Sequence, residues 1–257
     1  SSQLGLPLLP PYFSTILGCA LGFQLLEFLS APISRILFGT RYTTLKKATR
    51  RAWEEHVVGL VHALLIIPLA VYTRFYSPQR SVLENDKAFG FSEDAVPMFC
   101  VCVGYFFWDT IRELRNFSDF GFIAHGAACL VVYANAFRPF LAYYGSGFLL
   151  WEASTPLLHF HWFFDKLGMT GSLPQLINGV LLLGTFFTAR IVYGGYMTVE
   201  FFHTMQSIQH EIPAVQYYAY FGGNILLNGL NWFWFFKMIS ALRKRFVAPP
   251  PPQNGTD

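Results

Sequence analysis

Residues 173–203 read LPQLINGVLLLGTFFTARIVYGGYMTVEFFH, an apolar run that carries an arginine, Arg190, well inside it. At about 1.5 Å per residue, a helix of this length extends about 45 Å, enough to cross a bilayer while tilting or projecting from it. A charge at the centre of a membrane helix costs about 2.5 to 3.5 kcal/mol, so such residues usually face a protein interior or a wet cavity. The stretch therefore predicts a membrane helix whose arginine is functional.

The whole chain repeats this pattern. Apolar segments that suit a membrane occur at residues 10–29, 54–75, 95–112, 119–137, 140–161, 173–203 and 213–239, and most of them contain a charged residue or a histidine. Long continuous runs without alternation favour helices over strands. Of the 257 residues, 53% are hydrophobic and 13% are charged, whereas soluble domains are about one quarter charged. The sequence predicts an all-α polytopic membrane protein with seven transmembrane helices.

The basic residues between these segments predict the orientation of the chain. They gather in alternate connections and at the C-terminal end, as Arg35, Arg41, Lys46, Lys47, Arg50, Arg51, Arg112, Arg115, Lys166, Lys237, Arg243, Lys244 and Arg245. By the positive-inside rule that side is cytosolic, which makes the N-terminus lumenal and the C-terminus cytosolic. A net charge of only +3, without a basic stripe, argues against a nucleic-acid partner.

Polar residues inside the segments define a candidate site. Most of this polarity is expected in the cytosolic half, with Glu152 near mid-depth; the residues are His62, Asp109, His125, Glu152, His159, Asn224, Asn228 and Asn231. The three asparagines are spaced i, i+4 and i+7, which places them on one helical face. Convergence in one half predicts a water-accessible cavity. Arg190 lies deeper and is expected to hold a carboxylate or a phosphate.

Simpler interpretations of these residues remain open. His62 and His159 would also suit hydrogen-bonded interior positions without chemistry. Asp109 would suit an ion pair with Arg112, three residues further along the same helix. The asparagine face would suit the fastening of neighbouring helices through interhelical hydrogen bonds.

Five stretches resemble, in order, the landmarks of TLC-domain membrane proteins. They are Trp53–Ala63, Gly104–Asp109, Phe122–His125, Trp151–Pro156 and Phe186–Ile191. The resemblance covers about residues 45–245. The Glu-x-Ser-Thr-Pro and Phe-Phe-x-x-Arg-Ile elements look most like the small TLC-domain proteins of the endoplasmic reticulum, and less like the ceramide synthases.

The resemblance implies six core helices arranged as a barrel around a lipid cavity, preceded by one extra helix, in the endoplasmic-reticulum membrane. It divides the chain into an N-terminal helix and connection (1–39), a TLC domain (40–245) and a disordered cytosolic tail (246–257). Ceramide synthases carry two adjacent histidines where this chain has Ala124 and His125, and an Asp-x-Ser-Asp element where it has Glu152 to Thr155. A ceramide synthase is therefore not expected, while acyl transfer to another lipid stays open.

Acyl transfer would use His125 as a general base or a nucleophile, oriented by Asp109 or Glu152. Asn228 or Asn231 would hold the developing oxyanion. Acyl-CoA is the expected cosubstrate, with its chain in the barrel and its phosphates at Arg112 and Arg115, and no metal or tightly bound cofactor is expected.

Two functions without catalysis are open as well. A lipid-binding or lipid-sensing protein would need the cavity but not the chemistry, and a membrane adaptor would need neither. Membrane lipids are the expected partners, and the sequence leaves the oligomeric state open.

Overall fold

The computed structural model describes residues 6–116 and 120–246, with side chains up to Arg243, and their regular structure is helical throughout. The α-helices are α1 (Leu9–Phe38), α2 (Thr40–Thr43), α3 (Lys47–Val71), α4 (Arg80–Asn85), α5 (Val96–Arg115), α6 (Phe120–Ala134), α7 (Ala142–Phe148), α8 (Thr155–Lys166), α9 (Leu173–Phe186), α10 (Gly194–Ser207) and α11 (Ala214–Phe246). Three-ten segments are η3 (Glu93–Ala95), η4 (Asn135–Phe137) and η5 (Leu149–Ser154), and π-helical segments are η2 (Tyr72–Tyr76) and η6 (Phe187–Tyr193). The predicted all-α membrane fold is confirmed, and residues 247–257 of the predicted tail lie outside the described residues.

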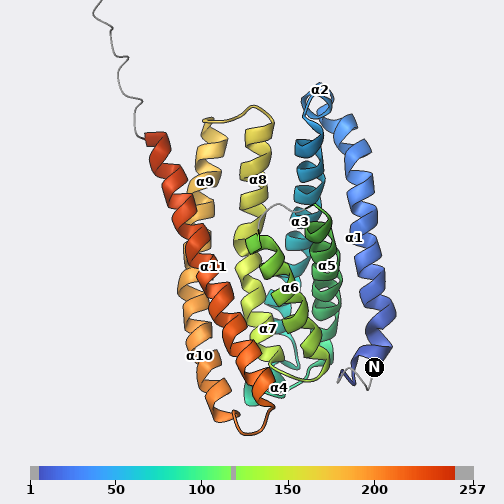
Figure 1. The fold of residues 1–257 in the computed structure, drawn as a ribbon, viewed down its shortest axis with the longest axis vertical. Coiled ribbons are helices and arrows are strands. Elements are labelled where there is room, and N and C mark those ends of the chain that lie inside the picture. Colours follow the sequence, from blue (N-terminus) through green and yellow to red (C-terminus); the bar gives the residue numbers. More distant parts are fainter. Residues whose placement is uncertain (1–5, 117–119, 247–257) are drawn as a thin grey trace, which may run out of the picture.

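Six helices of the described chain are long and apolar enough to cross a membrane. They are Leu9–Phe38, Lys47–Tyr76, Glu93–Arg115, Phe120–Phe137, Leu173–Ser207 and Ala214–Arg243. The one remaining segment that the sequence predicts to cross the membrane, residues 140–161, is a discontinuous rod in which α7, η5 and α8 follow one another. Figure 1 shows this rod running the height of the bundle between its neighbours.

The helices form an upright bundle in which α5 and α6 are the short members (Figure 1). We call the end where α1 finishes and α3 begins the basic end, because it carries Arg35, Arg41, Lys46 and Lys47. Helices α5 and α6 do not reach the level of α3 and α8 at this end. Among the described residues, these two short helices therefore leave the basic end of the bundle without a full ring of helices.

Backbone irregularities occur where they shape the interior. Helix α8 begins at Thr155, directly after the three-ten segment η5, and Pro156 lies in its first turn, where a proline gives up no hydrogen bond. The π-helical segment η6 contains Arg190, whose side chain is buried. Single π-helical turns inside α-helices often occur at functional sites. Both irregular segments lie in the middle of their rods, where they face each other.

Helix α1 packs closely against α5 because Gly104 has no side chain. A Cβ atom added at Gly104 would lie 2.6 Å from the Cβ of Cys19 and 2.9 Å from the carbonyl oxygen of Ile16. Small residues that let backbones approach are typical of membrane-helix interfaces, where burial of apolar surface gives little net drive for association. Gly104 therefore fixes the extra N-terminal helix to the bundle.

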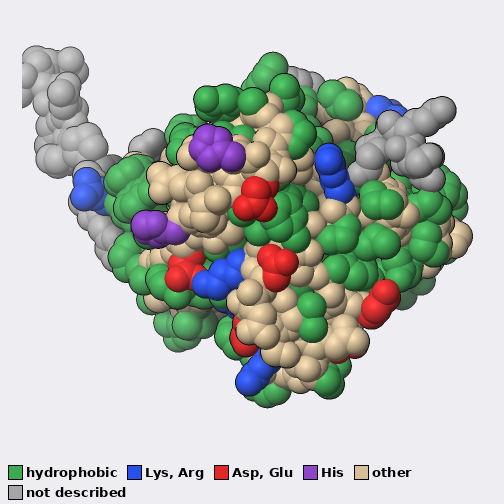
Figure 2. Space-filling view, turned by 90° about the horizontal axis from the view of Figure 1, so that it is seen from below, with side chains coloured by type: hydrophobic (Ala, Val, Ile, Leu, Met, Phe, Trp, Pro, Cys, Tyr) green, Lys and Arg blue, Asp and Glu red, His purple; other side chains and the backbone are tan. Residues whose placement is uncertain are grey.

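The solid core lies toward the end opposite the basic end. Its fully buried members include Ile66, Ala95, Met98, Phe137 and Met205, all near helix termini at that end. Figure 2 views this end from below and shows acidic and basic side chains interspersed among apolar ones. One pair there joins Lys87 to Glu200 at 2.7 Å, and this hydrogen bond raises the pKa of Lys87. The larger cavities of the described chain lie in the half of the bundle nearer the basic end.

Candidate functional site

Two neighbouring chambers inside the bundle share the side chain of His125 in their linings. The wide chamber has a volume of about 290 Å³ and extends along α5, α6, α8 and α11 toward the basic end. The narrow chamber has a volume of about 50 Å³ and continues toward the solid core. Phe106, His125 and Glu152 line both chambers. These three residues define what we call the junction.

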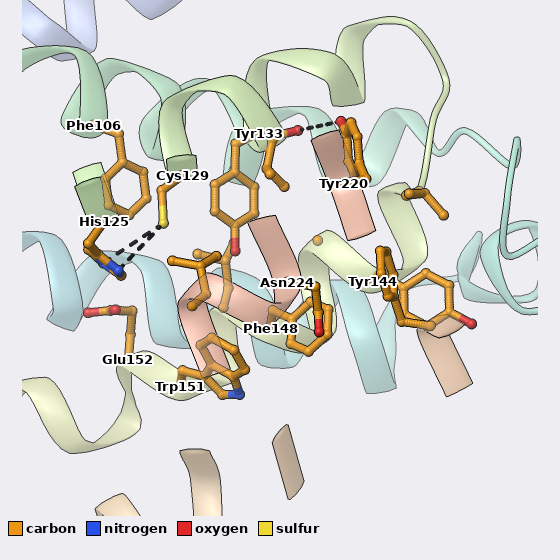
Figure 3. Close-up of a pocket in the computed structure, with 16 residues that line it drawn as sticks. Phe106, His125, Cys129, Tyr133, Tyr144, Phe148, Trp151, Glu152, Tyr220 and Asn224 are labelled. Carbon is orange, nitrogen blue, oxygen red and sulfur yellow. Dashed lines mark hydrogen bonds between the residues drawn. The ribbon is translucent and has the colours of Figure 1, made fainter. Parts of the chain in front are cut away.

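The two chambers differ in polarity. Asp109, Glu113, His159 and Lys237 contribute ionisable groups to the wide chamber. The narrow chamber is walled mainly by rings and aliphatic side chains, among them Tyr133, Tyr144, Phe148, Trp151 and Tyr220. Figure 3 shows His125 and Glu152 near one end of this chamber, with Tyr144 and Tyr220 toward the other. The cavity therefore grades from polar to apolar along its length.

His125 lies half-buried on α6 among aromatic rings and one thiol. Its ring nitrogens lie 3.8 and 4.0 Å from the Sγ atom of Cys129, one helical turn further on. The rings of Phe106 and Trp234 meet the imidazole at steep angles, with centroid distances of 5.9 and 5.6 Å. These contacts hold the imidazole ring, which lines both chambers.

Asp109 reaches the same region from α5. A Cβ atom added at Gly126 would lie 2.9 Å from its Oδ2 atom, so the carboxylate rests against α6 beside the residue that follows His125. Gly126 makes room for this approach. The structure thus places Asp109, His125 and Glu152 along one cavity.

Glu152 is held by Arg190. The Nη2 atom of Arg190 lies 3.4 Å from the Oε1 atom of Glu152, and both side chains are almost completely buried. Breaking a buried ion pair by removing one partner typically destabilises a protein by about 3 to 5 kcal/mol. The sequence predicts that Arg190 holds a carboxylate or a phosphate. In this structure Arg190 pairs with Glu152, a carboxylate of the same chain.

Arg190 also binds the backbone and side chains of two other rods. Its Nε atom donates to the Trp151 carbonyl oxygen at 3.0 Å and to the Ser154 hydroxyl at 3.2 Å. Its Nη1 atom donates to the Oδ1 atom of Asn231 at 3.2 Å, and its Nη2 atom donates to the Thr155 hydroxyl at 3.1 Å. The wide turn of η6 thereby joins η5 and α11 at the level of the junction.

The three asparagines of α11 have different roles. Asn231 accepts the hydrogen bond from Arg190. Asn228 donates to the hydroxyl of Thr198 on α10 at 3.0 Å and to the Oδ1 atom of Asn224 at 2.9 Å. Asn224 lines the narrow chamber. Fastening of helices, the simpler interpretation, therefore applies to Asn228 and Asn231 in this structure, whereas Asn224 faces the cavity.

The two histidines expected to bind substrate lie in different places. His159 lines the wide chamber and forms a 2.7 Å hydrogen bond between its Nδ1 atom and that of His56 on α3. His62 is buried one layer behind the wall, stacked on the ring of Tyr105 at a centroid distance of 3.6 Å. The face of α3 that carries His62 turns toward α1 and α5, so the structure does not bring His62 to the cavity.

The two arginines expected at the cavity rim are absent from the lining of the chambers in the described chain. Arg112 is buried between α1 and α3, with its Nε atom 2.5 Å from Glu27 and its Nη2 atom 2.9 Å from Glu55. This pairing also replaces the alternative pairing of Arg112 with Asp109. Arg115 is exposed at the end of α5. The cations that do line the wide chamber in the described chain are Lys237, on α11, and Arg190, which pairs with Glu152.

Sequence reasoning missed two cavity features for one reason. Lys237 is counted there among the cytosolic loop charges, and Cys129 is not singled out as a site residue. Each assignment used depth alone, and only the rotation of the helices about their axes shows which side chain faces the hollow. The i, i+4 spacing of His125 and Cys129 is a signal that could have linked the second of these to the site.

Comparisons with known proteins agree with this architecture. The family model of the TLC domain matches residues 52–240. An uncharacterized TLC domain-containing protein of Schizosaccharomyces pombe is 38% identical over 95% of this chain and 83% of its own length. Topoisomerase I damage affected protein 4 of Saccharomyces cerevisiae is 27% identical over 91% of this chain and 85% of its own. TLC domain-containing protein 4 of Xenopus tropicalis is 28% identical over 95% of this chain and 97% of its own.

Proposed function

The chain belongs to the TLC-domain family, and from this premise we propose that it handles lipids in the endoplasmic-reticulum membrane by binding an acyl chain across the junction. In the proposed topology the N-terminus is lumenal and the basic end faces the cytosol. The observation that carries the proposal is the graded cavity, which is polar near the basic end and aromatic deeper in the bundle. An acyl lipid has the same gradation, with a polar head and an apolar chain.

The proposed chemistry is acyl transfer from acyl-CoA to a hydroxyl or amine lipid. The carbons next to the carbonyl of the acyl group occupy the narrow chamber, which places the thioester carbonyl near His125 at the junction. The acceptor oxygen or nitrogen attacks the carbonyl carbon while His125 takes the acceptor proton. The carbon–sulfur bond then breaks, and the imidazolium returns the proton to the CoA thiolate. The products are an ester or amide lipid and free CoA.

The charges around the junction suit this step. An imidazolium formed on His125 gains from the nearby carboxylates of Asp109 and Glu152, because opposite charges attract strongly where water is excluded. Arg190 keeps Glu152 in place through its ion pair. Lys237 gives the wide chamber a cation for the phosphates of CoA, a role that Arg112 leaves open because it pairs with Glu27 and Glu55.

One observation supports the alternative, a non-catalytic lipid-binding or lipid-sensing role. In the described part of the chain, the polar contact of His125 is with the thiol of Cys129 instead of a carboxylate. A general base usually needs a partner that orients it. The cavity alone would serve a binding protein. A membrane adaptor, the further alternative, needs no cavity and gains no support from it.

The deciding experiment measures acyl-CoA consumption by purified full-length protein with a panel of hydroxyl and amine lipids. We expect His125→Ala to lower the rate by about 10² to 10⁴-fold, the usual contribution of a general acid or base. His203→Ala is the matched control, because His203 is an exposed histidine on α10 away from the chambers. Equal rates for wild type and His125→Ala would overturn the catalytic proposal.

Binding is measured separately by mass spectrometry of lipids that copurify with the protein. Leu227→Trp fills the narrow chamber, which Leu227 lines, whereas Leu226→Trp changes an exposed neighbour on the same helix. We expect only Leu227→Trp to lose the copurified acyl lipid. A wild type without acyl-CoA turnover but with this pattern would establish the binding role.

A further inference from the structure

A third cavity lies beside the wide chamber and outside the site described above. It has a volume of about 160 Å³ and is enclosed by α8, α9 and α11 near the basic end. His161 on α8 and Gln175 on α9 are its polar lining residues, and the other lining residues are apolar or glycine. The ring of His161 lies over Gly179, where an added Cβ atom would be 3.3 Å from the Cε1 atom. We call this cavity the side pocket.

The lining of the side pocket changes from polar to apolar in the same direction as a lipid in the adjoining leaflet, from headgroup to hydrocarbon chain. Gln175 lies in the first turn of α9, at the level of the basic end. Leu182 and Leu183 line the pocket two turns deeper, which is about 10 Å further along the helix. A headgroup would therefore meet the amide and imidazole, and a hydrocarbon chain would continue along the leucines.

The lining also indicates the charge of the headgroup. Within the described chain, the lining contains no aspartate, glutamate, lysine or arginine. A phosphate or ammonium headgroup would stay without a counter-ion there, which is costly in a low-dielectric site. A hydroxyl group, which donates and accepts one hydrogen bond at a time, matches the imidazole and the amide. The chemistry of the pocket therefore favours a neutral lipid alcohol.

The pocket faces the bilayer, whereas the wide chamber extends toward the basic end. Leu176 on α9 and Ala241 on α11 line the pocket and are both exposed on the outer surface of the bundle. The neighbouring Ile177 and Val180 on α9 are exposed as well, as expected for a surface that meets acyl chains. A ligand thus reaches the pocket laterally, from the membrane.

Only a thin wall separates the side pocket from the reaction site. Leu158 and Met238 line both the side pocket and the wide chamber. Methionine is unbranched and adapts its shape readily, so a wall that contains Met238 can open without backbone movement. A hydroxyl group in the side pocket would need to pass this wall to enter the chamber that contains His125.

We propose that the side pocket is the binding site of the acceptor, a neutral single-chain lipid alcohol that enters between α9 and α11 and presents its hydroxyl group past Leu158 and Met238. The role of the alcohol as acyl acceptor rests on the proposed function, whereas its binding to the side pocket does not. A volume of about 160 Å³ is below the usual 300 to 1,000 Å³ of a pocket that encloses a whole ligand, so the pocket holds the headgroup and first methylenes while the chain end stays in lipid.

The test uses the full-length protein in lipid nanodiscs and a long-chain alcohol that carries a photoreactive diazirine and an alkyne. Crosslinked residues are identified by mass spectrometry. Leu183→Trp fills the pocket, and Leu181→Trp is the matched control because Leu181 is exposed on the same helix and does not line the pocket. We expect Leu183→Trp to lower crosslinking within α9 and α11 by about tenfold, equivalent to about 1.4 kcal/mol of binding, and Leu181→Trp to leave it unchanged.

A second probe distinguishes the pocket from ordinary lipid contact. The same chain with a terminal methyl group instead of the hydroxyl should label α9 and α11 equally in the wild type and in Leu183→Trp. Labelling by the alcohol that is identical in both variants, or that follows the exposed positions of α9, would overturn the proposal. Folding of each variant is checked by its thermal unfolding midpoint.

The outcome also separates this inference from the proposed function. If Leu183→Trp abolishes transfer to the alcohol but keeps the copurified acyl lipid, the pocket is the acceptor site. If the wild type shows no transfer while crosslinking still depends on Leu183, the lipid-alcohol site stands and acyl transfer fails. If transfer to the alcohol is the same in Leu183→Trp and in the wild type, the pocket is not the acceptor site.

Discussion

The guanidinium of Arg190 and the carboxylate of Glu152 lie 3.4 Å apart although 38 residues separate them in the chain. Arg190 belongs to a π-helical segment and Glu152 to a three-ten segment, so the two irregular stretches of backbone face each other at the junction. Asn231 of α11 completes the contact. The relative positions of three rods around the cavity therefore depend on one arginine.

Arg190→Met should destabilise the protein by about 3 to 5 kcal/mol, because it leaves the carboxylate of Glu152 buried without a partner. The double variant Arg190→Met/Glu152→Leu should recover part of this loss, since it removes the unpaired charge. The midpoint of unfolding in a denaturing-detergent titration measures both effects. A cost below about 1 kcal/mol for Arg190→Met would contradict a structural role for the ion pair.

Arg112→Leu should be strongly destabilising and Arg115→Leu nearly neutral, although both arginines end the same helix. Arg112 lies between Glu27 and Glu55, and its loss leaves two carboxylates close together in the bundle. We expect a cost of about 3 kcal/mol for Arg112→Leu and within about 0.5 kcal/mol for the exposed Arg115→Leu. Thermal unfolding midpoints of the two variants provide the comparison. Equal midpoints would show that the buried triad adds nothing to stability.

Gly104→Ala and Gly22→Ala should change stability in opposite directions. The added methyl group at Gly104 would meet the backbone oxygen of Ile16 at 2.9 Å, which forces α1 away from α5; such overpacking costs about 1 to 3 kcal/mol. No atom lies within 4 Å of the corresponding position at Gly22, so alanine there should stabilise the helix by about 0.5 to 1 kcal/mol. Unfolding midpoints that move in the same direction would argue against the tight α1–α5 contact.

Lys237→Glu should weaken the binding of acyl-CoA by about tenfold or more, because it reverses the charge of a cation that lines the wide chamber and, unlike Arg190, is not paired with Glu152. Arg243→Glu, on the same helix but outside the lining, makes the same charge change and should have a small effect. Titration of a fluorescent acyl-CoA at low and at physiological ionic strength measures both. The difference between the variants should shrink as salt screens the charges. Equal weakening by both would indicate a general surface field instead of a site at Lys237.

Much of the fold follows from the sequence because membrane insertion depends on local composition. The six long helices and the position of the discontinuous segment at residues 140–161 are visible as apolar runs, and the five family stretches identify the TLC domain. The mid-depth position of Glu152 is visible as well, since depth follows from position along a helix, whereas Arg190, which the sequence places deeper, lies at the level of Glu152. The sequence did not predict that the segment at residues 140–161 is divided into α7, η5 and α8.

The candidate site shows the same division. The sequence alone placed His125, Asp109, Glu152 and Arg190 in the interior, because a charge or an imidazole in lipid is costly enough to exclude the alternative. Only the tertiary structure decided that Arg112 turns toward α1 and that Lys237 lines the wide chamber. The rotation of each helix about its axis is set by close packing and hydrogen bonds to several neighbours at once. That balance is spread over contacts distant in sequence, which is why composition and periodicity predicted the depth of these residues but not the direction in which they point.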